Sequence, residues 1–459
     1  MARLSVDQIG TAHVGALTES SRLAANLLSG PRQDLDTSRI RAQVPPLRPH
    51  YAQRVETTPL RRNRDFVLLQ TGQLLSNAGT QSASIAYPLL VLALTHSAAD
   101  AGIVAFVRSA AQVLSTLPAG LAADRWPRKQ LMISADGVRL AAVAALGAAV
   151  LHHSVGLWAI ALAAFIEGSG TALFASAQAG ALRAVVSSTQ LPAAAAAQTG
   201  RQAAVLLAGP PLGGALFGVG RALPFLADGA SYLASTGSLL AMRTPFQEQR
   251  QPDPASAGRG VAEGFRFLWG QPFLRTTALL FGLGNFIGPG VLFSLVVIGR
   301  RQGLSAGAVG GLAATFGASV LIGAAVSPLM RQALSPRAVL LLELWSGTAI
   351  AAFLVWPTVY VLAACIVPTA LVIPSTDSVV HGYRVAMTPD RLLGRSESAR
   401  SLLSLTISPL GPLMAGLLLE ASARAAIALF AAVALALALW GTASPAVRAA
   451  PRLEALRST

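Results

Sequence analysis

The sequence predicts an all-α, polytopic membrane protein with twelve transmembrane helices in two six-helix lobes related by a pseudo-twofold axis. Of its 459 residues, 53% are hydrophobic and 12% are charged, whereas soluble domains carry about a quarter charged residues. From Phe66 onward, apolar runs of about 18–28 residues recur, which is the length an α-helix needs to cross the hydrocarbon core. Most of the basic residues lie between these runs.

The spans are expected to be helices, because an open strand would leave unpaired backbone groups in lipid. A polar segment at 243–270 separates the first six spans from the last six. The predicted spans are 66–94, 98–122, 131–151, 156–180, 194–218 and 221–242 before this segment, and 271–298, 306–330, 337–356, 358–383, 397–420 and 424–441 after it.

This division predicts five regions along the chain. Residues 1–65, rich in arginine and proline, are expected to be a disordered cytoplasmic tail; a start codon assigned too early and a functional domain are the alternatives. The other regions are a six-helix lobe at 66–242, a cytoplasmic linker at 243–270, a second six-helix lobe at 271–442 and a cytoplasmic tail at 443–459.

The loop arginines predict the orientation of the chain. Cytoplasmic loops of membrane proteins carry an excess of Lys and Arg. With both termini inside, the opposite side keeps only a few cations, and we therefore predict a multi-pass protein of the cell (plasma) membrane with both termini cytoplasmic. The outer cations are Arg221, Arg300, Arg301 and Arg424.

Composition and motifs exclude several classes of protein. The net charge of +15 is spread between apolar segments, which indicates membrane topology and no nucleic-acid partner. Cys365 is the single cysteine, so no internal disulfide can form. Without a His-Glu-x-x-His motif or a paired nucleophile and base, no enzyme activity, metal or cofactor is expected. Lys129 is the only lysine, and no glycine-rich phosphate loop precedes it, which argues against an ATP-driven pump.

Charged residues inside the predicted spans are the strongest pointers to function. A charge at the centre of a bilayer costs about 2.5–3.5 kcal/mol on insertion scales. Glu167 lies near the middle of its span and is the best candidate for proton coupling, with Arg108 as its partner or as an attractor of an acidic solute. A static ion pair is the alternative. Asp228 and Asp377 lie off-centre and are weaker candidates for coupling, and Glu343 lies nearer the cytoplasmic end.

Polar residues form a stripe along the first span. Steps of three and four residues place these side chains on one helix face. Because each polar group in lipid needs a partner, the stripe is expected to face a central substrate cavity, and hydrogen bonds between helices are the alternative. The stripe consists of the amides Gln70, Gln73, Asn77 and Gln81, followed by Ser84.

The loop from Gly120 to Lys129, GLAADRWPRK, resembles the loop between helices 2 and 3 of the major facilitator superfamily, G-x-L-A-D-R-x-G-R-K. Pro127 stands where the pattern has its second glycine. Proline fixes the backbone angle φ, whereas glycine could turn freely at this position. The resemblance implies a conformational latch between the lobes, and a role in topology alone is the alternative. The implied latch residues are Gly120, Asp124, Arg125, Arg128 and Lys129, extended by Asp136 and Arg139.

The fifth span carries Gly209-Pro210-Pro211-Leu212-Gly213-Gly214, which resembles the G-P-x-x-G-G element of facilitator exporters that exchange solute for protons. Val205 stands where the fuller element has a further glycine, so the match is partial. Proline kinks a helix and glycine allows close packing, and a packing kink alone is the alternative. Arg201 lies nine residues before Pro210, as Arg400 lies before Pro409 in the eleventh span, which indicates parallel repeats.

Within the superfamily, the segments 94–98, 124–129 and 389–395 and the pair Asp136 and Arg139 resemble the branch of siderophore and drug exporters similar to the enterobactin exporter. This resemblance implies secondary active export of an amphiphilic small molecule by proton antiport with alternating access. A facilitator-fold importer or a lipid flippase is the alternative. The expected partners are the small-molecule substrate, protons and the lipid bilayer, with the protein a monomer. The identity of the substrate stays open.

Overall fold

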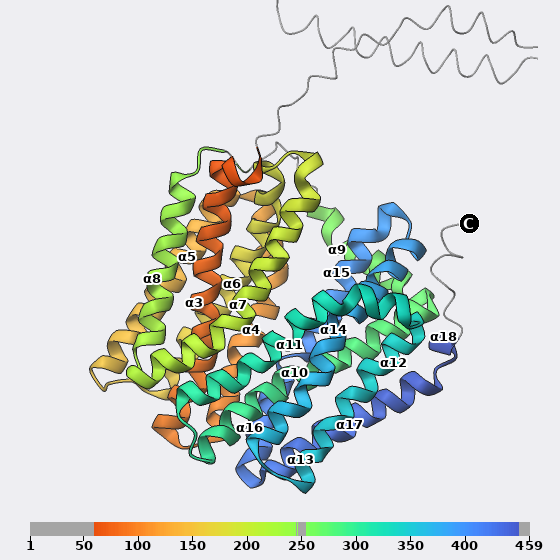
Figure 1. Ribbon diagram of the computed structural model, residues 1–459. Helices are drawn as coiled ribbons and strands as arrows, with labels where there is room; N and C mark the ends of the chain where they lie inside the picture. The colour runs from red at the N-terminus through yellow and green to blue at the C-terminus, as the bar shows by residue number, and fades with distance from the viewer. Residues whose placement is uncertain (1–58, 245, 247–253, 449–459) are drawn as a thin grey trace, which may run out of the picture. The chain divides into compact units, whose positions relative to one another are not determined.

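The computed structural model describes residues 59–244, 246 and 254–448, and all regular structure within them is helical. Figure 1 shows the helices, of which α3–α8 form the N-terminal lobe and α10–α17 the C-terminal lobe. The prediction of an all-α fold is therefore confirmed. Most of the predicted tail at 1–65 lies outside the described residues.

The six helices of the N-terminal lobe follow the predicted spans closely. The first begins at Arg64, inside the predicted tail, because the Asn63 side chain accepts a hydrogen bond from the Phe66 amide at 3.1 Å and caps the helix. The bounds are α3 Arg64–Thr95, α4 Ala98–Arg125, α5 Arg128–Leu151, α6 Leu157–Val185, α7 Leu191–Val219 and α8 Leu223–Ala241, with 3₁₀ turns η2 Leu60–Arg62 and η3 Ser188–Gln190.

Two predicted spans of the C-terminal lobe, the ninth and the eleventh, are interrupted. The ninth is divided into an α-helix, a 3₁₀ turn and a short α-helix. The eleventh breaks at Ser408 and Pro409, because proline cannot donate its backbone hydrogen bond. The predicted linker contains a helix, α9 Pro254–Gly270. The lobe comprises α10 Pro272–Arg301, α11 Ala306–Ala333, α12 Pro336–Ser346 with η4 Gly347–Ala351 and α13 Ala352–Val355, α14 Val359–Met387, α15 Asp390–Ile407, α16 Leu410–Ala421 and α17 Ala423–Ala443, followed by α18 Pro445–Arg448.

Within the described residues, 10 helical segments are long and apolar enough to cross a membrane. The other two predicted spans, 66–94 and 221–242, are helical as α3 and α8 but are less apolar. Their polar residues are among those placed in the candidate site below. The count of twelve spans therefore stays a prediction.

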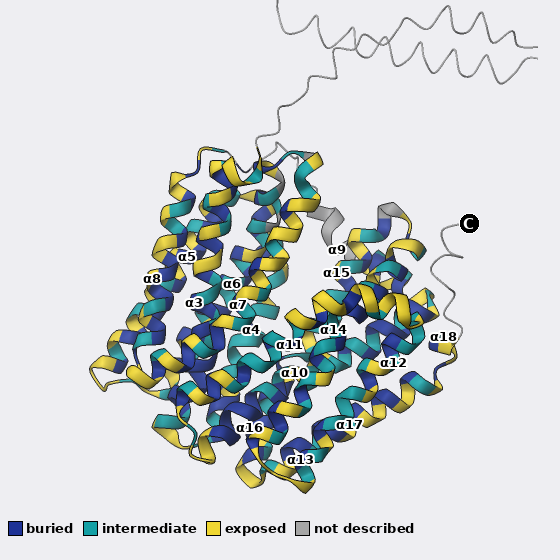
Figure 2. Ribbon diagram, in the orientation of Figure 1, coloured by how far each residue is buried: buried dark blue, intermediate teal, exposed yellow. Residues whose placement is uncertain are grey.

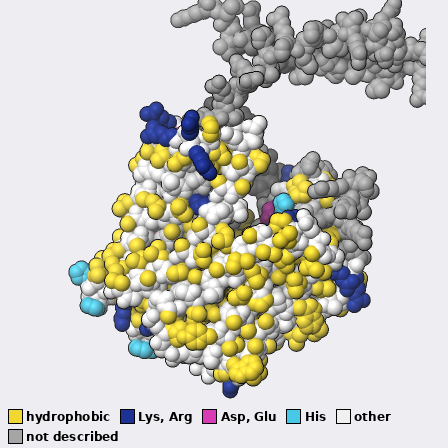
Figure 3. All heavy atoms as spheres, viewed as in Figure 1, with side chains coloured by type: hydrophobic (Ala, Val, Ile, Leu, Met, Phe, Trp, Pro, Cys, Tyr) yellow, Lys and Arg dark blue, Asp and Glu magenta, His cyan; other side chains and the backbone are white. Residues whose placement is uncertain are grey.

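The helices expose apolar side chains, as lipid-facing helices do. Leu114, Trp158 and Leu329 are 73%, 87% and 64% exposed. Figure 2 shows exposed positions along the outer faces of the helices, and Figure 3 shows that hydrophobic side chains cover much of the visible face. Lys and Arg side chains in that view lie mostly towards its margins. This distribution agrees with a membrane-embedded protein.

The two lobes meet through small residues. We call the end at which α3 finishes and α4 begins the outer end, and the opposite end the inner end. A Cβ on Gly102 of α4 would lie 2.8 Å from the Pro412 carbonyl oxygen of α16, and one on Gly214 of α7 would lie 2.3 Å from the Ala306 carbonyl oxygen of α11. These helices approach so closely because glycine has no side chain.

Candidate functional site

A buried ion pair joins α4 to α6 in the N-terminal lobe. Arg108 Nη2 donates to Glu167 Oε1 at 2.5 Å, and Arg108 Nε donates to the same oxygen at 3.2 Å. The Glu167 side chain is 0% exposed and that of Arg108 is 20% exposed. Gly168 allows this approach, since a Cβ there would lie 2.1 Å from the Arg108 carbonyl oxygen. Arg108 and Glu167 were predicted to be partners, and they form an ion pair in the structure. This arrangement agrees with the alternative to proton coupling, a static ion pair.

A second buried pair lies on α5. Arg139 forms an ion pair with Asp136 one turn earlier, and both side chains are buried. The Arg139 guanidinium carbon lies 4.3 Å from the ring centroid of Tyr232 on α8 and 5.1 Å from that of Phe174 on α6. These contacts provide cation–π attraction in a desolvated place. The sequence predicted that Asp136 and Arg139, one turn apart in the third span, extend the latch; both side chains are buried within the lobe, and their latch role stays a prediction.

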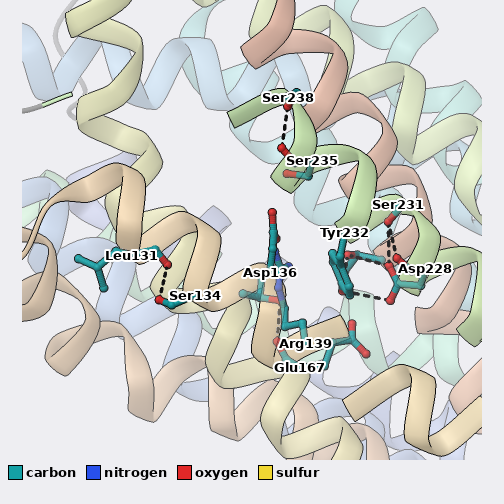
Figure 4. A network of polar contacts seen from close by, with 12 residues as sticks. Leu131, Ser134, Asp136, Arg139, Glu167, Asp228, Ser231, Tyr232, Ser235 and Ser238 are labelled. Carbon is teal, nitrogen blue, oxygen red and sulfur yellow. Dashed lines mark hydrogen bonds and ion pairs between the residues drawn. The ribbon is translucent and has the colours of Figure 1, made fainter. Parts of the chain in front are cut away.

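Asp228 is surrounded by hydroxyl groups (Figure 4). The Tyr232 hydroxyl donates to Asp228 Oδ2 at 3.0 Å, and Ser231 Oγ lies 3.4 Å from Oδ1. Thr80 of α3 lies 3.5 Å from Oδ1 and 3.0 Å from the Tyr232 hydroxyl. The side-chain hydrogen bonds that Asp228 accepts thus come from neutral groups. Tyr232 and Thr80 were missed from the sequence, although Tyr232 lies one helical turn after Asp228.

We call these five charged residues the N-lobe cluster: Arg108, Asp136, Arg139, Glu167 and Asp228. All three carboxylates are 0% exposed. Each arginine is paired with one carboxylate, so Asp228 is left with hydroxyl partners only. A buried carboxylate without a compensating charge is costly. The cluster is therefore one positive charge short of balance, which a single proton would restore.

The polar stripe of α3 is used partly for contacts within the lobe. Gln70 Oε1 accepts from Arg201 Nε of α7 at 3.0 Å, and Gln73 Oε1 accepts from Gln178 Nε2 of α6 at 2.6 Å. Asn77 and Gln81 are half-buried. Two of the four amides thus make the hydrogen bonds between helices that were the alternative, and the role of the stripe in a substrate cavity stays a prediction.

The implied latch residues lie at the inner ends of α4 and α5. Asp124 and Arg125 are exposed in the last turn of α4, and Pro127 becomes the residue before α5 with φ −58°. Lys129 Nζ donates to the Met242 carbonyl at 2.8 Å, where a cation stabilises the end of α8. Arg128 lies across α6, since a Cβ on Gly180 would lie 1.9 Å from its Nη1. Gly120 lies near the end of α4, with nothing within 4 Å of a Cβ placed on it.

An acid missed from the sequence supports this inner end. Asp65 accepts hydrogen bonds from the backbone amides of Arg243 and Thr244 at 3.2 and 2.8 Å and from the Thr244 hydroxyl. Burial alone would raise the pKa of Asp65, but these hydrogen bonds lower it below its ordinary value. The residue therefore joins the start of α3 to the segment after α8 as a carboxylate.

The predicted element in the fifth span packs α7 against two neighbours. A Cβ on Gly213 would lie 2.3 Å from the Ser82 carbonyl oxygen of α3, and one on Gly209 would lie 2.5 Å from the Gln81 Cβ. Gly214 instead contacts α11 of the other lobe, and a Cβ on Gly310 of α11 would lie 2.4 Å from the Pro210 carbonyl oxygen. The element thus lies where the lobes meet, and its link to the direction of transport stays a prediction.

At the outer end, a second missed acid connects the lobes. Glu420 Oε1 of α16 accepts from the Ser97 hydroxyl and from the Ala99 amide, each at 2.9 Å. Ser97 is the N-cap of α4, so a carboxylate of one lobe caps a helix of the other. Arg301 lies 3.6 Å from the second carboxylate oxygen. This contact at the outer end has no equivalent at Asp124, which is exposed.

Asp377 lies away from the N-lobe cluster. It lines a cavity in the C-terminal lobe together with Glu343 and Arg400. The structure therefore does not bring Asp377 together with Glu167 and Asp228, with which it was grouped from the sequence.

The sequence of the chain is similar to those of known membrane transporters. The profile of the Major Facilitator Superfamily matches residues 71–344. A relative named multidrug efflux pump Tap, from Mycolicibacterium fortuitum, is 29% identical over 418 residues, which cover 85% of this chain and 97% of the relative. The enterobactin exporter EntS of Salmonella typhimurium is 25% identical over 338 residues, covering 72% and 80%.

Solved structures share the fold at low sequence identity. The nucleoside transporter NupG has a TM-score of 0.63 at 12% identity, covering 85% of this chain and 100% of that chain. A bacterial homologue of the human lysosomal transporter Spinster, inward-facing and occupied, has a TM-score of 0.64 at 14% identity, covering 84% and 98%. The family profile covers more than half of the sequence, and the chain belongs to the major facilitator superfamily of membrane transporters.

Proposed function

We propose that the protein is a secondary active exporter of an amphiphilic small molecule in the cell membrane, driven by proton influx through alternating access. It would act as a monomer with both termini cytoplasmic and without a cofactor. Two relatives that cover most of the chain are named as a multidrug efflux pump and an enterobactin exporter, which supports export of a drug, siderophore or other natural product. One charge crossing 100 mV supplies about 2.3 kcal/mol, enough for a useful gradient.

The observation that carries proton coupling is the imbalance of the N-lobe cluster. Three buried carboxylates face two arginines, and Asp228 is the carboxylate without an arginine partner. A protonated Asp228 can donate to a neighbouring hydroxyl, whereas an ionised one can only accept. We propose that Asp228 binds the coupled proton and that Glu167 mainly holds Arg108. The sequence alone favoured Glu167 as the proton-binding residue. The two assignments, Asp228 and Glu167, predict different results for the variants that follow.

Variants that change the net charge of the N-lobe cluster distinguish the two assignments. Their transport is measured in proteoliposomes with an imposed pH difference. Asp228→Asn and Glu167→Gln each leave two carboxylates for two arginines, so both variants should bind no proton and build no solute gradient. The double variant Arg108→Gln with Glu167→Gln is again one charge short and should recover proton-driven transport. Solute exchange without a pH difference is the control for folding and binding.

Two results would change the assignment. Proton-driven transport by Asp228→Asn at the level of the parent would remove Asp228 from the mechanism. A double variant that exchanges solute but builds no gradient would return the role to Glu167. Direction is measured with the same solute in inverted and right-side-out vesicles, where uptake only into right-side-out vesicles would favour the importer.

A further inference from the structure

The C-terminal lobe contains a cavity of about 450 Å³. All of its lining residues lie between 280 and 437, on helices of this lobe alone. Its volume falls within the range of cavities that hold drug-sized ligands, about 300–1,000 Å³. We call it the C-lobe chamber.

The wall of the chamber is mostly apolar, with a few charged groups. Phe281 and Phe316 contribute aromatic surface, and Glu343, Asp377 and Arg400 contribute the charges. An apolar wall with a few converging polar groups is the usual character of a small-molecule site. The aromatic rings also suit an organic cation, which is attracted to their faces.

The arginines near the chamber are already engaged. Arg400 donates to Glu397 at 2.8 and 3.2 Å, and Arg384 forms an ion pair with the same carboxylate. Asp377 lies in the electrostatic field of both arginines. An anionic ligand would therefore compete with Glu397 for its cations and would face two further carboxylates.

Glu343 is the carboxylate left over. None of the ion pairs among the described residues includes Glu343, and the charged group that acts on it is another carboxylate, Asp377. Its Oε2 atom is buried and makes no hydrogen bond. The charged groups in and around the chamber are thus two arginines, Arg384 and Arg400, and three carboxylates, Glu343, Asp377 and Glu397, which is one positive charge short, as in the N-lobe cluster.

The two lobes differ in the space beside the missing charge. The carboxylates of the N-lobe cluster are wholly buried, which suits a proton. Glu343 instead borders a cavity large enough for a molecule. We propose that the C-lobe chamber binds an amphiphilic organic cation, with its positive group beside Glu343 and its apolar body against the chamber wall. This inference rests on the proposed export of an amphiphile and specifies the charge of its substrate.

Cys365, the only cysteine, lines the chamber and reports whether it is occupied. The experiment uses the full-length protein in detergent, with tetraphenylphosphonium as the cation and tetraphenylborate as an anion of the same shape. Tetraphenylphosphonium should bind and should slow the labelling of Cys365 by N-ethylmaleimide, measured by mass spectrometry. Tetraphenylborate at the same concentration should do neither.

Two variants test separately whether binding depends on the charge of Glu343 and on the free volume of the chamber. Glu343→Gln should weaken tetraphenylphosphonium binding by at least about tenfold, equivalent to about 1.4 kcal/mol. Gly284→Leu should block binding while keeping Glu343, because Gly284 lines the chamber and nothing lies within 4 Å of a Cβ placed there. Glu263→Gln in the linker helix and Gly311→Leu on α11, where a Cβ also has 4 Å of free space, are the matched controls and should bind normally.

Three results would overturn the inference: equal protection by the anion, binding that leaves Cys365 unprotected, or binding unchanged in both variants. These outcomes are independent of the proposed proton coupling, because binding is measured at equilibrium without a pH difference. Asp228→Asn should keep tetraphenylphosphonium binding and lose only proton-driven transport. Loss of chamber binding with intact export would refute the chamber alone.

Discussion

At the scale of single residues, pairing decides what each buried charge can do. Arg108 is held by Glu167 and Arg139 by Asp136, while Asp228 has hydroxyl neighbours. Removing one member of a buried pair leaves the other uncompensated, which costs more than removing both. Measurements of stability therefore report the ion pairing within the cluster, whereas measurements of proton-driven transport report its net charge.

Arg108→Gln should lower the free energy of unfolding by about 3–5 kcal/mol, because it leaves Glu167 buried without its cation. Adding Glu167→Gln should restore at least half of the loss. Thermal melting of the purified variants in detergent measures both effects, with the exposed Arg424→Gln as control. Additive losses in the double variant would show that the pair contributes no coupling energy.

Asp65 gives a pH-dependent prediction. Hydrogen bonds from Arg243 and Thr244 lower its pKa in the folded protein, so it stabilises the fold above the unfolded pKa of about 3.9 and loses this effect as the pH falls through the folded value. Asp65→Asn should cost about 1 kcal/mol at neutral pH. The difference in melting temperature between parent and variant should be constant from pH 8 to 6, by the same linkage, and narrow below about pH 4. A difference that persists at pH 3 would contradict this reading.

At the scale of helices, glycine determines how closely α7 packs. Gly213 faces α3 within the lobe, Gly214 faces α11 across the lobes, and Gly218 has nothing within 4 Å of a Cβ. Substitutions at these three positions of α7 therefore test packing within the lobe, packing between the lobes and neither, respectively.

Gly214→Leu should force the lobes apart at the outer end and make the transporter leaky to protons and solute. Gly213→Leu should separate α7 from α3 and uncouple transport, with reduced abundance in the membrane. Gly218→Leu should resemble the parent. Solute retention and proton leak in proteoliposomes measure the first two effects. A full proton-dependent gradient in Gly213→Leu or Gly214→Leu would show that close packing is not required.

At the scale of the whole molecule, two acids lie at opposite ends of the lobes. Glu420 bonds across the lobes at the outer end, whereas Asp124 is exposed at the inner end. If the protein alternates between states, the Glu420 contact favours the state closed outside, and the predicted latch at Asp124 favours the state closed inside.

Glu420→Gln and Asp124→Asn should therefore change access to the interior in opposite directions. Glu420→Gln should increase labelling of a cysteine introduced in the outer half of α11 by an impermeant thiol reagent, and Asp124→Asn should decrease it. Both assays start from a Cys365→Ala parent. Efflux should fall severely in Asp124→Asn at unchanged membrane abundance. Normal efflux at normal abundance would exclude the latch role.

The sequence by itself determined the helical class, the positions of the helices and the charged residues that interrupt apolar runs. These properties are local, because length and hydropathy of a segment decide whether it can cross a membrane. The first residue of α4, Ala98, and the last residue of α5, Leu151, match the predicted spans, whereas the inner ends of both helices extend three residues further than predicted.

Only the tertiary structure decided which charges meet. Asp65 contacts Thr244 across 179 positions and Arg108 contacts Glu167 across 59, so no local pattern contains either pair. The same packing brings Thr80 of α3 to Asp228 and Tyr232 of α8, and opens the chamber beside Glu343. Partner choice depends on which helix faces approach one another, and glycine contacts such as Gly168 on Arg108 set that approach in three dimensions.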